Sequence, residues 1–202
     1  MSKHTRAYFV MAKRVLRYFK GTRDYGLLWR KPASPDLHFI ANADTDLGSK
    51  KNDRRSITGS VLQMNGCTYV YRSHKQSNTQ DDTCSAEFIA AAECSVITVW
   101  THNLCEELNL CCRCPTVLYQ DNQSTIKVIK ATKCNYKIKS MDLKYHKVRD
   151  LNERGNFDVK YCDSTDMLAV IFTKPLESMQ FAKLHERLNV EPIPVLESSA
   201  ED

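Results

Sequence analysis

The sequence predicts an α/β protein in which a mixed β-sheet packs against helices. Short apolar stretches that suit buried strands alternate along the chain with longer segments of helical periodicity. Over residues 37–172 the predicted elements read β-β-β-α-β-α-α-β-α in chain order, an alternation that places helices against a sheet with parallel and antiparallel neighbours. At 202 residues, with 42% hydrophobic and 26% charged side chains, the chain is long enough for one well-packed core.

The predicted strands are short and are bounded by turn residues. Five are expected, over residues 37–43, 57–64, 68–71, 116–120 and 157–161. The second and third form a hairpin, because Asn65-Gly66 between them is a strong two-residue turn signal. The first runs directly into Asp44. Polar connectors are expected over residues 48–53 and 72–82.

The predicted helices follow a 3.6-residue periodicity of apolar side chains. Six are expected, over residues 4–20, 84–108, 122–130, 141–153, 165–172 and 176–188. Gly21 is a plausible C-cap for the first. The longest helix is expected to bury one face, composed of Phe88, Ala91, Ala92, Val96, Val99 and Trp100. The Pro-rich, acidic tail from Glu191 is expected to be disordered.

Composition excludes several classes of protein. No apolar run is long enough for a membrane span, and the N-terminus has no signal-peptide core, so an intracellular location without a membrane partner is expected. The nine cysteines are odd in number and lack paired C-x2-C spacing, which favours reduced thiols over disulfides or a zinc site. The net charge of +5 is concentrated in basic stretches over residues 1–31 and 127–149. These fit a polyanion partner, although basic runs are more often solvated faces.

Three acidic residues stand where sheet elements end or a helix begins: Asp44, Glu87 and Asp121. Each has a structural explanation, since Asp44 suits a turn, Glu87 the positive end of a helix dipole, and Asp121 an N-cap. Together they suit a metal site, because a pair of divalent ions roughly 3.5–4 Å apart requires several carboxylate oxygens on rigid elements. Magnesium is the ion that this set of oxygen ligands favours.

Ordered motif blocks carry a resemblance to a known family. Residues 15–22, Val-Leu-Arg-Tyr-Phe-Lys-Gly-Thr, resemble the segment that follows the reverse transcriptase of Copia-type LTR retrotransposons. Further blocks resemble the ribonuclease H domain of the same polyproteins, in the same order, over residues 53–59, 86–90, 119–123, 145–149 and 171–176. The resemblance covers about residues 6 to 190 and identifies the chain as a C-terminal fragment of such a Pol polyprotein.

The resemblance implies a ribonuclease H-like fold, a five-stranded mixed sheet flanked by helices. It also implies a division of the chain into three parts. Residues 1–35 would be the tail of the reverse transcriptase or connection segment, residues 36–175 the ribonuclease H-like domain, and residues 176–202 a C-terminal helix with a disordered acidic tail.

The implied activity is metal-dependent, endonucleolytic hydrolysis of the RNA strand of RNA–DNA hybrids during reverse transcription. Asp44, Glu87 and Asp121 would be the catalytic residues and the ligands of two Mg2+ ions, for which Mn2+ can substitute. Asp46 is a reserve candidate for a metal ligand, behind these three. Contacts to the nucleic acid are expected from Asn122, Gln123 and Lys127, although helix capping explains Asn122 about as well. The implied partners are the RNA–DNA hybrid and a separate reverse transcriptase, in a cytoplasmic virus-like particle or the nucleus.

One departure from the family's motifs bears on catalysis. The last catalytic aspartate of the family lies in Leu-Ala-Asp-Ile-Phe-Thr-Lys, and this chain has Val170 at that position. Valine can neither ligate metal nor accept a hydrogen bond, so weakened activity is expected. The alternative is a catalytically inactive transposon remnant that still binds RNA–DNA hybrid or duplex RNA.

Overall fold

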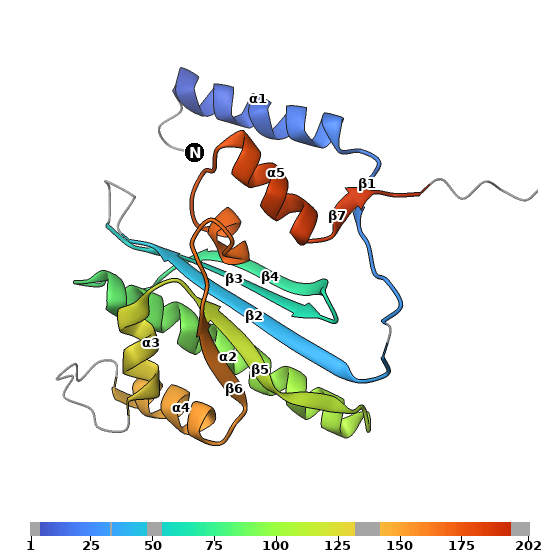
Figure 1. Ribbon diagram of the computed structural model, residues 1–202. Coiled ribbons are helices and arrows are strands. Elements are labelled where there is room, and N and C mark those ends of the chain that lie inside the picture. The colour runs from blue at the N-terminus through green and yellow to red at the C-terminus, as the bar shows by residue number, and fades with distance from the viewer. Residues whose placement is uncertain (1–4, 33, 48–53, 132–141, 195–202) are drawn as a thin grey trace, which may run out of the picture.

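A five-stranded sheet forms the centre of the molecule (Figure 1). The computed structural model describes residues 5–32, 34–47, 54–131 and 142–194, and for residues 142–145 it describes the backbone alone. The strands are β2 (Leu37–Asp46), β3 (Ile57–Met64), β4 (Cys67–Lys75), β5 (Cys112–Gln120) and β6 (Phe157–Tyr161). Their order across the sheet is β4-β3-β2-β5-β6. The predicted α/β class with a mixed sheet is confirmed.

The sheet is antiparallel on one side and parallel on the other. β3 pairs antiparallel with both β2 and β4, whereas β5 pairs parallel with both β2 and β6. The hairpin between β3 and β4 turns at Asn65 and Gly66, whose φ angles of 49° and 79° are those that a tight two-residue turn requires. The predicted connector from residue 72 is wrong at its start, because β4 continues to Lys75 by backbone pairing with β3.

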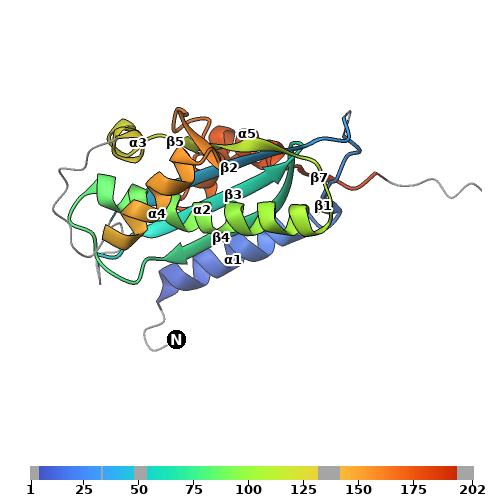
Figure 2. The same ribbon diagram turned by 90° about the horizontal axis from the view of Figure 1, so that it is seen from below.

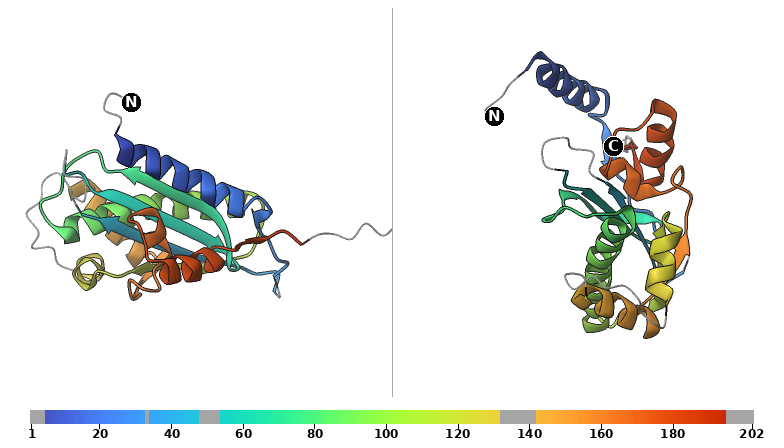
Figure 3. Two further views of the ribbon diagram at one scale, coloured as in Figure 1. Left: turned by 90° about the horizontal axis from the view of Figure 1, so that it is seen from above. Right: turned by 90° about the vertical axis from the view of Figure 1, so that its left-hand side faces the viewer.

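Helices cover both faces of the sheet (Figure 3). The helices are α1 (Arg6–Gly21), α2 (Thr83–Glu107), α3 (Gln123–Lys130), α4 (Asp142–Glu153) and α5 (Ser178–Arg187), with a 3-10 helix η1 (Leu168–Phe172). α2, α3 and α4 lie on one face, and Figure 2 shows α2 in front of the sheet with α4 beside it. α5 and η1 lie on the opposite face, so the two parts of the core are separated by the sheet. In the described ranges no helix has the length and apolar character needed to cross a membrane.

The predicted helix over residues 165–172 is wrong in type and extent. Its first residues form a turn, because the carboxylate of Asp163 accepts hydrogen bonds from both the amide and the hydroxyl of Thr165. Only Leu168–Phe172 is helical, as a 3-10 helix, and Pro175 follows closely behind it. The short η1 therefore packs against β3 where a longer helix was expected.

The buried face of α2 differs from the predicted one. Val96 and Trp100 are exposed by 48% and 59%, whereas Ser95, Thr98 and Thr101 are buried. The three hydroxyls are accommodated because each donates to a carbonyl in the preceding turn of the same helix. The first half of the predicted face is confirmed, since the side chains from Phe88 to Ala92 pack on the sheet.

The terminal segments meet in a second, two-stranded sheet. β1 (Tyr25–Leu27) pairs antiparallel with β7 (Val190–Pro192), and the Arg30 guanidinium lies 2.6 Å from the Glu191 carboxylate. The prediction of disorder from Glu191 onward is therefore wrong for the residues of β7. Residues 195–202 and the predicted turn at 48–53 lie outside the described residues.

α1 stands apart from the two helix layers (Figure 1). None of its residues is buried, and its apolar side chains Phe9, Leu16 and Phe19 are each more than 60% exposed. It meets α5 near its C-terminal end, where the Tyr18 hydroxyl lies 2.8 Å from Nε2 of His185. The predicted helix is confirmed, with Thr22 rather than Gly21 at its C-cap.

Candidate metal centre

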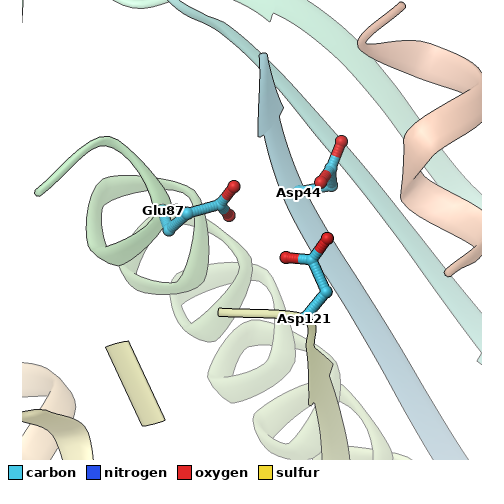
Figure 4. A group of neighbouring side chains, drawn as sticks. All are labelled: Asp44, Glu87 and Asp121. Atoms are coloured by element: carbon cyan, nitrogen blue, oxygen red, sulfur yellow. The ribbon is translucent and has the colours of Figure 1, made fainter. Parts of the chain in front are cut away.

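Three carboxylates from three separate elements meet at one end of the sheet (Figure 4). Asp44 lies near the C-terminal end of β2, Glu87 in the first turns of α2, and Asp121 directly after β5. One oxygen of each lies within 4.8 Å of the others. The structure thus brings together the three acids that the sequence singled out.

The register of the sheet explains why Asp44 and Asp121 converge. β2 and β5 are parallel neighbours in which Asn42 pairs with Tyr119. Two residues further along the two strands, Asp44 and Asp121 therefore lie level with each other. Because parallel strands end at the same edge, both carboxylates emerge there. Glu87 reaches this edge from α2, whose start is fixed by Asp82: its carboxylate accepts from the Ser85 amide at 2.7 Å.

The capping explanation for Asp121 is not what the structure shows. The N-cap of α3 is Asn122, whose side-chain oxygen accepts from the Thr125 amide at 3.0 Å. The backbone amide of Asp121 donates to the side chain of Gln120 at 3.1 Å. The carboxylate of Asp121 is therefore free of the capping function and faces Asp44 and Glu87 (Figure 4).

Of the three carboxylates, Glu87 has the electrostatic environment that most disfavours its charged form. Its side chain is 3% exposed, and one oxygen accepts from the Thr45 amide at 3.2 Å. The second oxygen has no hydrogen-bond partner within the described part of the chain. Burial, followed by the negative charges of Asp44 and Asp121, raises the pKa of Glu87 to about 9. A bound cation would relieve this penalty.

The two aspartates carry smaller perturbations of the same sign. Burial raises the pKa of Asp44, the hydrogen bond from the Thr173 hydroxyl lowers it, and the charge of Asp121 raises it. Burial also raises the pKa of Asp121, whereas the positive charge of Lys174 lowers it. Lys174 is exposed and acts on both aspartates, so one cation of the chain already lies close to the site.

The donor set fits a hard divalent cation. Three carboxylates on rigid elements, one of them buried with an unpartnered oxygen, offer the oxygen ligands that Mg2+ and Mn2+ prefer. Among the described residues this is the only group of three or more metal-ligating side chains. The eight cysteines in the same ranges form no disulfide with one another.

Val170 contributes no ligand from its side chain. It is fully buried and packs in an apolar cluster with Met167 and Ala169, against Tyr119, Cys162 and Leu176. Asp46, the reserve ligand, is the last residue of β2 and is absent from the carboxylate cluster. Gln123 and Lys127 are exposed on α3, the helix that follows Asp121.

Two residues beside the site, Thr173 and Lys174, were not expected there from the sequence. Thr173 is buried and donates a hydrogen bond to Asp44, and Lys174 supplies the nearby positive charge. The sequence indicates these two residues only by their position, since both lie inside the motif block over residues 171–176. Nothing in their residue types distinguishes them from ordinary surface residues.

These observations define a class of fold. An antiparallel β4-β3-β2 sheet that continues into parallel β5 and β6, with helices on both faces, is a ribonuclease H-like fold. The chain's homologues are Pol polyproteins of Copia/Ty1-type retrotransposons. No protein-family model matches the chain.

Two relatives show the extent of this similarity. The chain is 29% identical over 182 residues, 90% of its length, to the retrovirus-related Pol polyprotein from transposon RE2 of Arabidopsis thaliana. It is 29% identical over 179 residues, 86% of its length, to the transposon Ty1-NL2 Gag-Pol polyprotein of Saccharomyces cerevisiae. These matches span only 12% and 10% of the two polyproteins.

Solved structures of similar shape are distant in sequence. The N-terminal RNase H domain of a Mycobacterium tuberculosis protein aligns with a TM-score of 0.49 and 10% identity, covering 74% of this chain and 97% of that one. LC11-RNase H1, solved in complex with an RNA/DNA hybrid, aligns with a TM-score of 0.44 and 12% identity over 62% of this chain and 86% of that one.

Proposed function

We propose that this chain is a ribonuclease H that hydrolyses the RNA strand of RNA–DNA hybrids endonucleolytically with the help of divalent metal ions. The observation that carries this proposal is the convergence of Asp44, Glu87 and Asp121, with one oxygen of buried Glu87 unpartnered. The Pol polyprotein relatives favour an RNA–DNA hybrid as substrate, because reverse transcription produces such hybrids. Residues 36–175 would form the catalytic domain.

Mg2+, or Mn2+ in its place, would be held by the three carboxylates. When bound, such ions lower the pKa of an attacking water and stabilise the leaving oxygen. The chain itself supplies the rigid frame: the Thr45 amide holds one oxygen of Glu87, and the end of β5 directs Asp121 inward. Preorganised ligands of this kind avoid the cost of reorganisation during reaction.

The nucleic acid would approach along α3 and the exposed edge of the site. Gln123 and Lys127 are exposed there, and we propose that Gln123 contacts the RNA 2′-hydroxyls and Lys127 a phosphate. Asn122 uses its side-chain oxygen for the helix cap, so only its amide group is available for such a contact. Lys174, beside the carboxylates, would bind a phosphate near the cleaved bond.

The absence of a carboxylate at Val170 predicts weak rather than full activity. Three of the four acids of the family motif are present and brought together, so the metal-binding core is retained. Because its relatives are retrotransposon polyproteins, we propose that the protein acts in a cytoplasmic virus-like particle or in the nucleus, together with a separate reverse transcriptase. These locations and this partner are part of the proposal.

Cleavage of a labelled RNA–DNA hybrid by the purified chain tests the activity. With Mg2+ or Mn2+ we expect products with 5′-phosphate and 3′-hydroxyl ends, and we expect Asp44→Asn to abolish them. Asp150→Asn is the matched control, because Asp150 lies on the exposed surface of α4, outside the carboxylate cluster. Wild-type cleavage no greater than that of Asp44→Asn in both metals would contradict the proposal.

A second candidate is an inactive remnant that binds hybrid or duplex RNA without cutting it. The apolar packing of Val170 favours this reading, because that side chain cannot take part in metal binding. Binding of the same hybrid by both wild type and Asp44→Asn, without cleavage by either, would support it. The two readings therefore separate in one experiment.

A further inference from the structure

We infer that Thr173 is a positioning residue of the carboxylate site, whose hydroxyl holds one oxygen of Asp44 while the other oxygen faces Glu87 and Asp121. This inference rests on the proposed metal-dependent function, and it assigns a task to a residue outside the three acids. Figure 4 shows the two oxygens of Asp44 pointing in different directions, one of them toward Asp121.

The contact between Thr173 and Asp44 is buried on both sides. Thr173 is 5% exposed and Asp44 2%, and the Thr173 hydroxyl donates to Oδ2 of Asp44. The same hydroxyl lies 3.0 Å from the carbonyl oxygen of Val170. A hydroxyl has one proton to donate, and an ionised carboxylate is the stronger acceptor. Among the described residues no other side chain hydrogen-bonds to the Asp44 carboxylate.

The backbone around Thr173 is fixed at the end of η1. The amides of Thr173 and Lys174 both donate to the carbonyl of Val170, at 3.1 and 3.3 Å. Two bonds to one acceptor leave the segment little freedom, so the hydroxyl is held in place rather than reaching out from a loop.

The sheet beneath η1 is built for this close approach. Gly59 of β3 pairs directly with Asp44 in the antiparallel register. A Cβ atom at Gly59 would lie 2.4 Å from the Ala169 carbonyl oxygen and 2.8 Å from Cγ2 of Thr173. Only glycine lets η1 lie directly on β3, and this contact places Thr173 over Asp44.

A purely structural function for Thr173 predicts a different outcome from a positioning function. If the hydroxyl only capped the end of η1, its removal would lower stability and leave ion binding unchanged. If the hydroxyl orients Asp44, its removal weakens ion binding, because ligands lose affinity when the groups that orient them are lost.

Calorimetric titration of the full chain with Mn2+ tests the inference independently of activity. We expect Thr173→Val to weaken Mn2+ binding by about 10- to 100-fold, and Thr173→Ser, which keeps the hydroxyl, to remain within about 3-fold of wild type. Thr101→Val is the matched control. Thr101 is also 5% exposed, but its hydroxyl donates within α2, four turns from Glu87 on the same helix. Melting temperatures establish that each variant is folded.

The inference would be overturned by wild-type Mn2+ affinity in Thr173→Val, or by equal losses of affinity in Thr173→Val and Thr173→Ser. Absence of Mn2+ binding by the wild type would overturn it as well. If Thr173→Val does not fold, the Mn2+ affinities of Thr173→Ala and Thr173→Ser give the same comparison, because serine keeps the hydroxyl and alanine lacks it. A wild type that binds Mn2+ more tightly than Thr173→Val but cuts no hybrid would contradict the proposed function and leave the inference standing.

Discussion

Glu87 carries a large electrostatic penalty in the absence of metal. Its carboxylate is buried beside two other acids, and its pKa rises from 4.5 to about 9. The folded chain therefore keeps the Glu87 proton over a pH range in which the unfolded chain has released it. Since the folded state then binds more protons, this group lowers the free energy of unfolding as pH rises from about 4.5 toward about 9.

Replacing Glu87 by Gln should remove that dependence. Without divalent ions we expect Glu87→Gln to raise the free energy of unfolding at neutral pH by roughly 1–3 kcal/mol, and its stability to vary less with pH. Added Mn2+ should stabilise the wild type and have little effect on the variant. Denaturant unfolding at several pH values, with and without Mn2+, measures both effects. A wild-type stability that rises over this pH range would contradict the assignment of Glu87 as the perturbed group.

Val170 offers a direct test of the missing carboxylate. Because Val170 lies in an apolar cluster, Val170→Asp should cost about 1–3 kcal/mol of stability in the absence of divalent ions. If this position borders the metal centre, Mg2+ should recover much of that loss and cleavage should rise about tenfold or more. Thermal melts with and without Mg2+ and the hybrid assay measure the two effects. Val170→Asn supplies the neutral control, and an unchanged rate in Val170→Asp would show that the motif alignment misplaces this ligand.

At the scale of elements, the close contact between η1 and β3 accompanies the hydrogen bond from Thr173 to Asp44. The chain was expected to form an α-helix over residues 165–172, and it forms a five-residue 3-10 helix instead. Periodicity of apolar residues could not reveal this, because the Asp163 side-chain bonds to Thr165 compete with helix formation locally. The shorter element lies against Gly59, which explains how Thr173 reaches Asp44.

Gly59→Ala should therefore disturb the site without changing any of its ligands. The added Cβ would clash with the Ala169 carbonyl, so η1 must shift, at a cost of about 1–3 kcal/mol in stability. We expect a lower melting temperature together with weaker Mn2+ binding and slower cleavage. Gly21→Ala is the matched control, because a Cβ at Gly21 meets no atom within 4 Å. Full Mn2+ affinity in Gly59→Ala would show that the position of η1 does not matter for the site.

At the scale of the whole molecule, the charge distribution suits an extended polyanion. The net charge is +5, and exposed lysines lie on α3 and beside the carboxylates, at Lys127, Lys130 and Lys174. Phosphate contacts release counterions, so binding should weaken as salt concentration rises. This behaviour belongs to the surface as a whole and is independent of the three acids.

We expect the hybrid affinity of the cleavage-deficient Asp44→Asn variant to fall with a log–log salt slope of about −2 to −3, as for three phosphate contacts. Lys127→Ala should make that slope less steep by about 1. Lys183→Ala should leave the slope unchanged, because Lys183 lies on α5, on the other face of the sheet from α3, and pairs with Asp166. Fluorescence anisotropy at several salt concentrations measures the slopes. A slope unaffected by Lys127→Ala would exclude this residue from the nucleic-acid contact.

The sequence by itself determined the local features of this protein. The five strands, the Asn65-Gly66 turn, the long α2 and the three acids at element ends were all predictable, because strand alternation, turn geometry and helix periodicity act between residues close in the chain. The predictions from sequence failed at two kinds of position. Thr98 is buried because its hydroxyl donates to a backbone carbonyl of its own helix. Glu191 lies in a strand because β1, which is distant in the chain, pairs with it.

Only the tertiary structure decided which groups surround the three acids. Thr173 and Asp44 are 129 residues apart in the chain, and their contact depends on η1 lying against Gly59 across the sheet. The raised pKa of Glu87 likewise arises from burial and from neighbours on other elements. No local pattern encodes such contacts, because hydrogen bonds and charges act through space and the sheet brings distant segments to one edge.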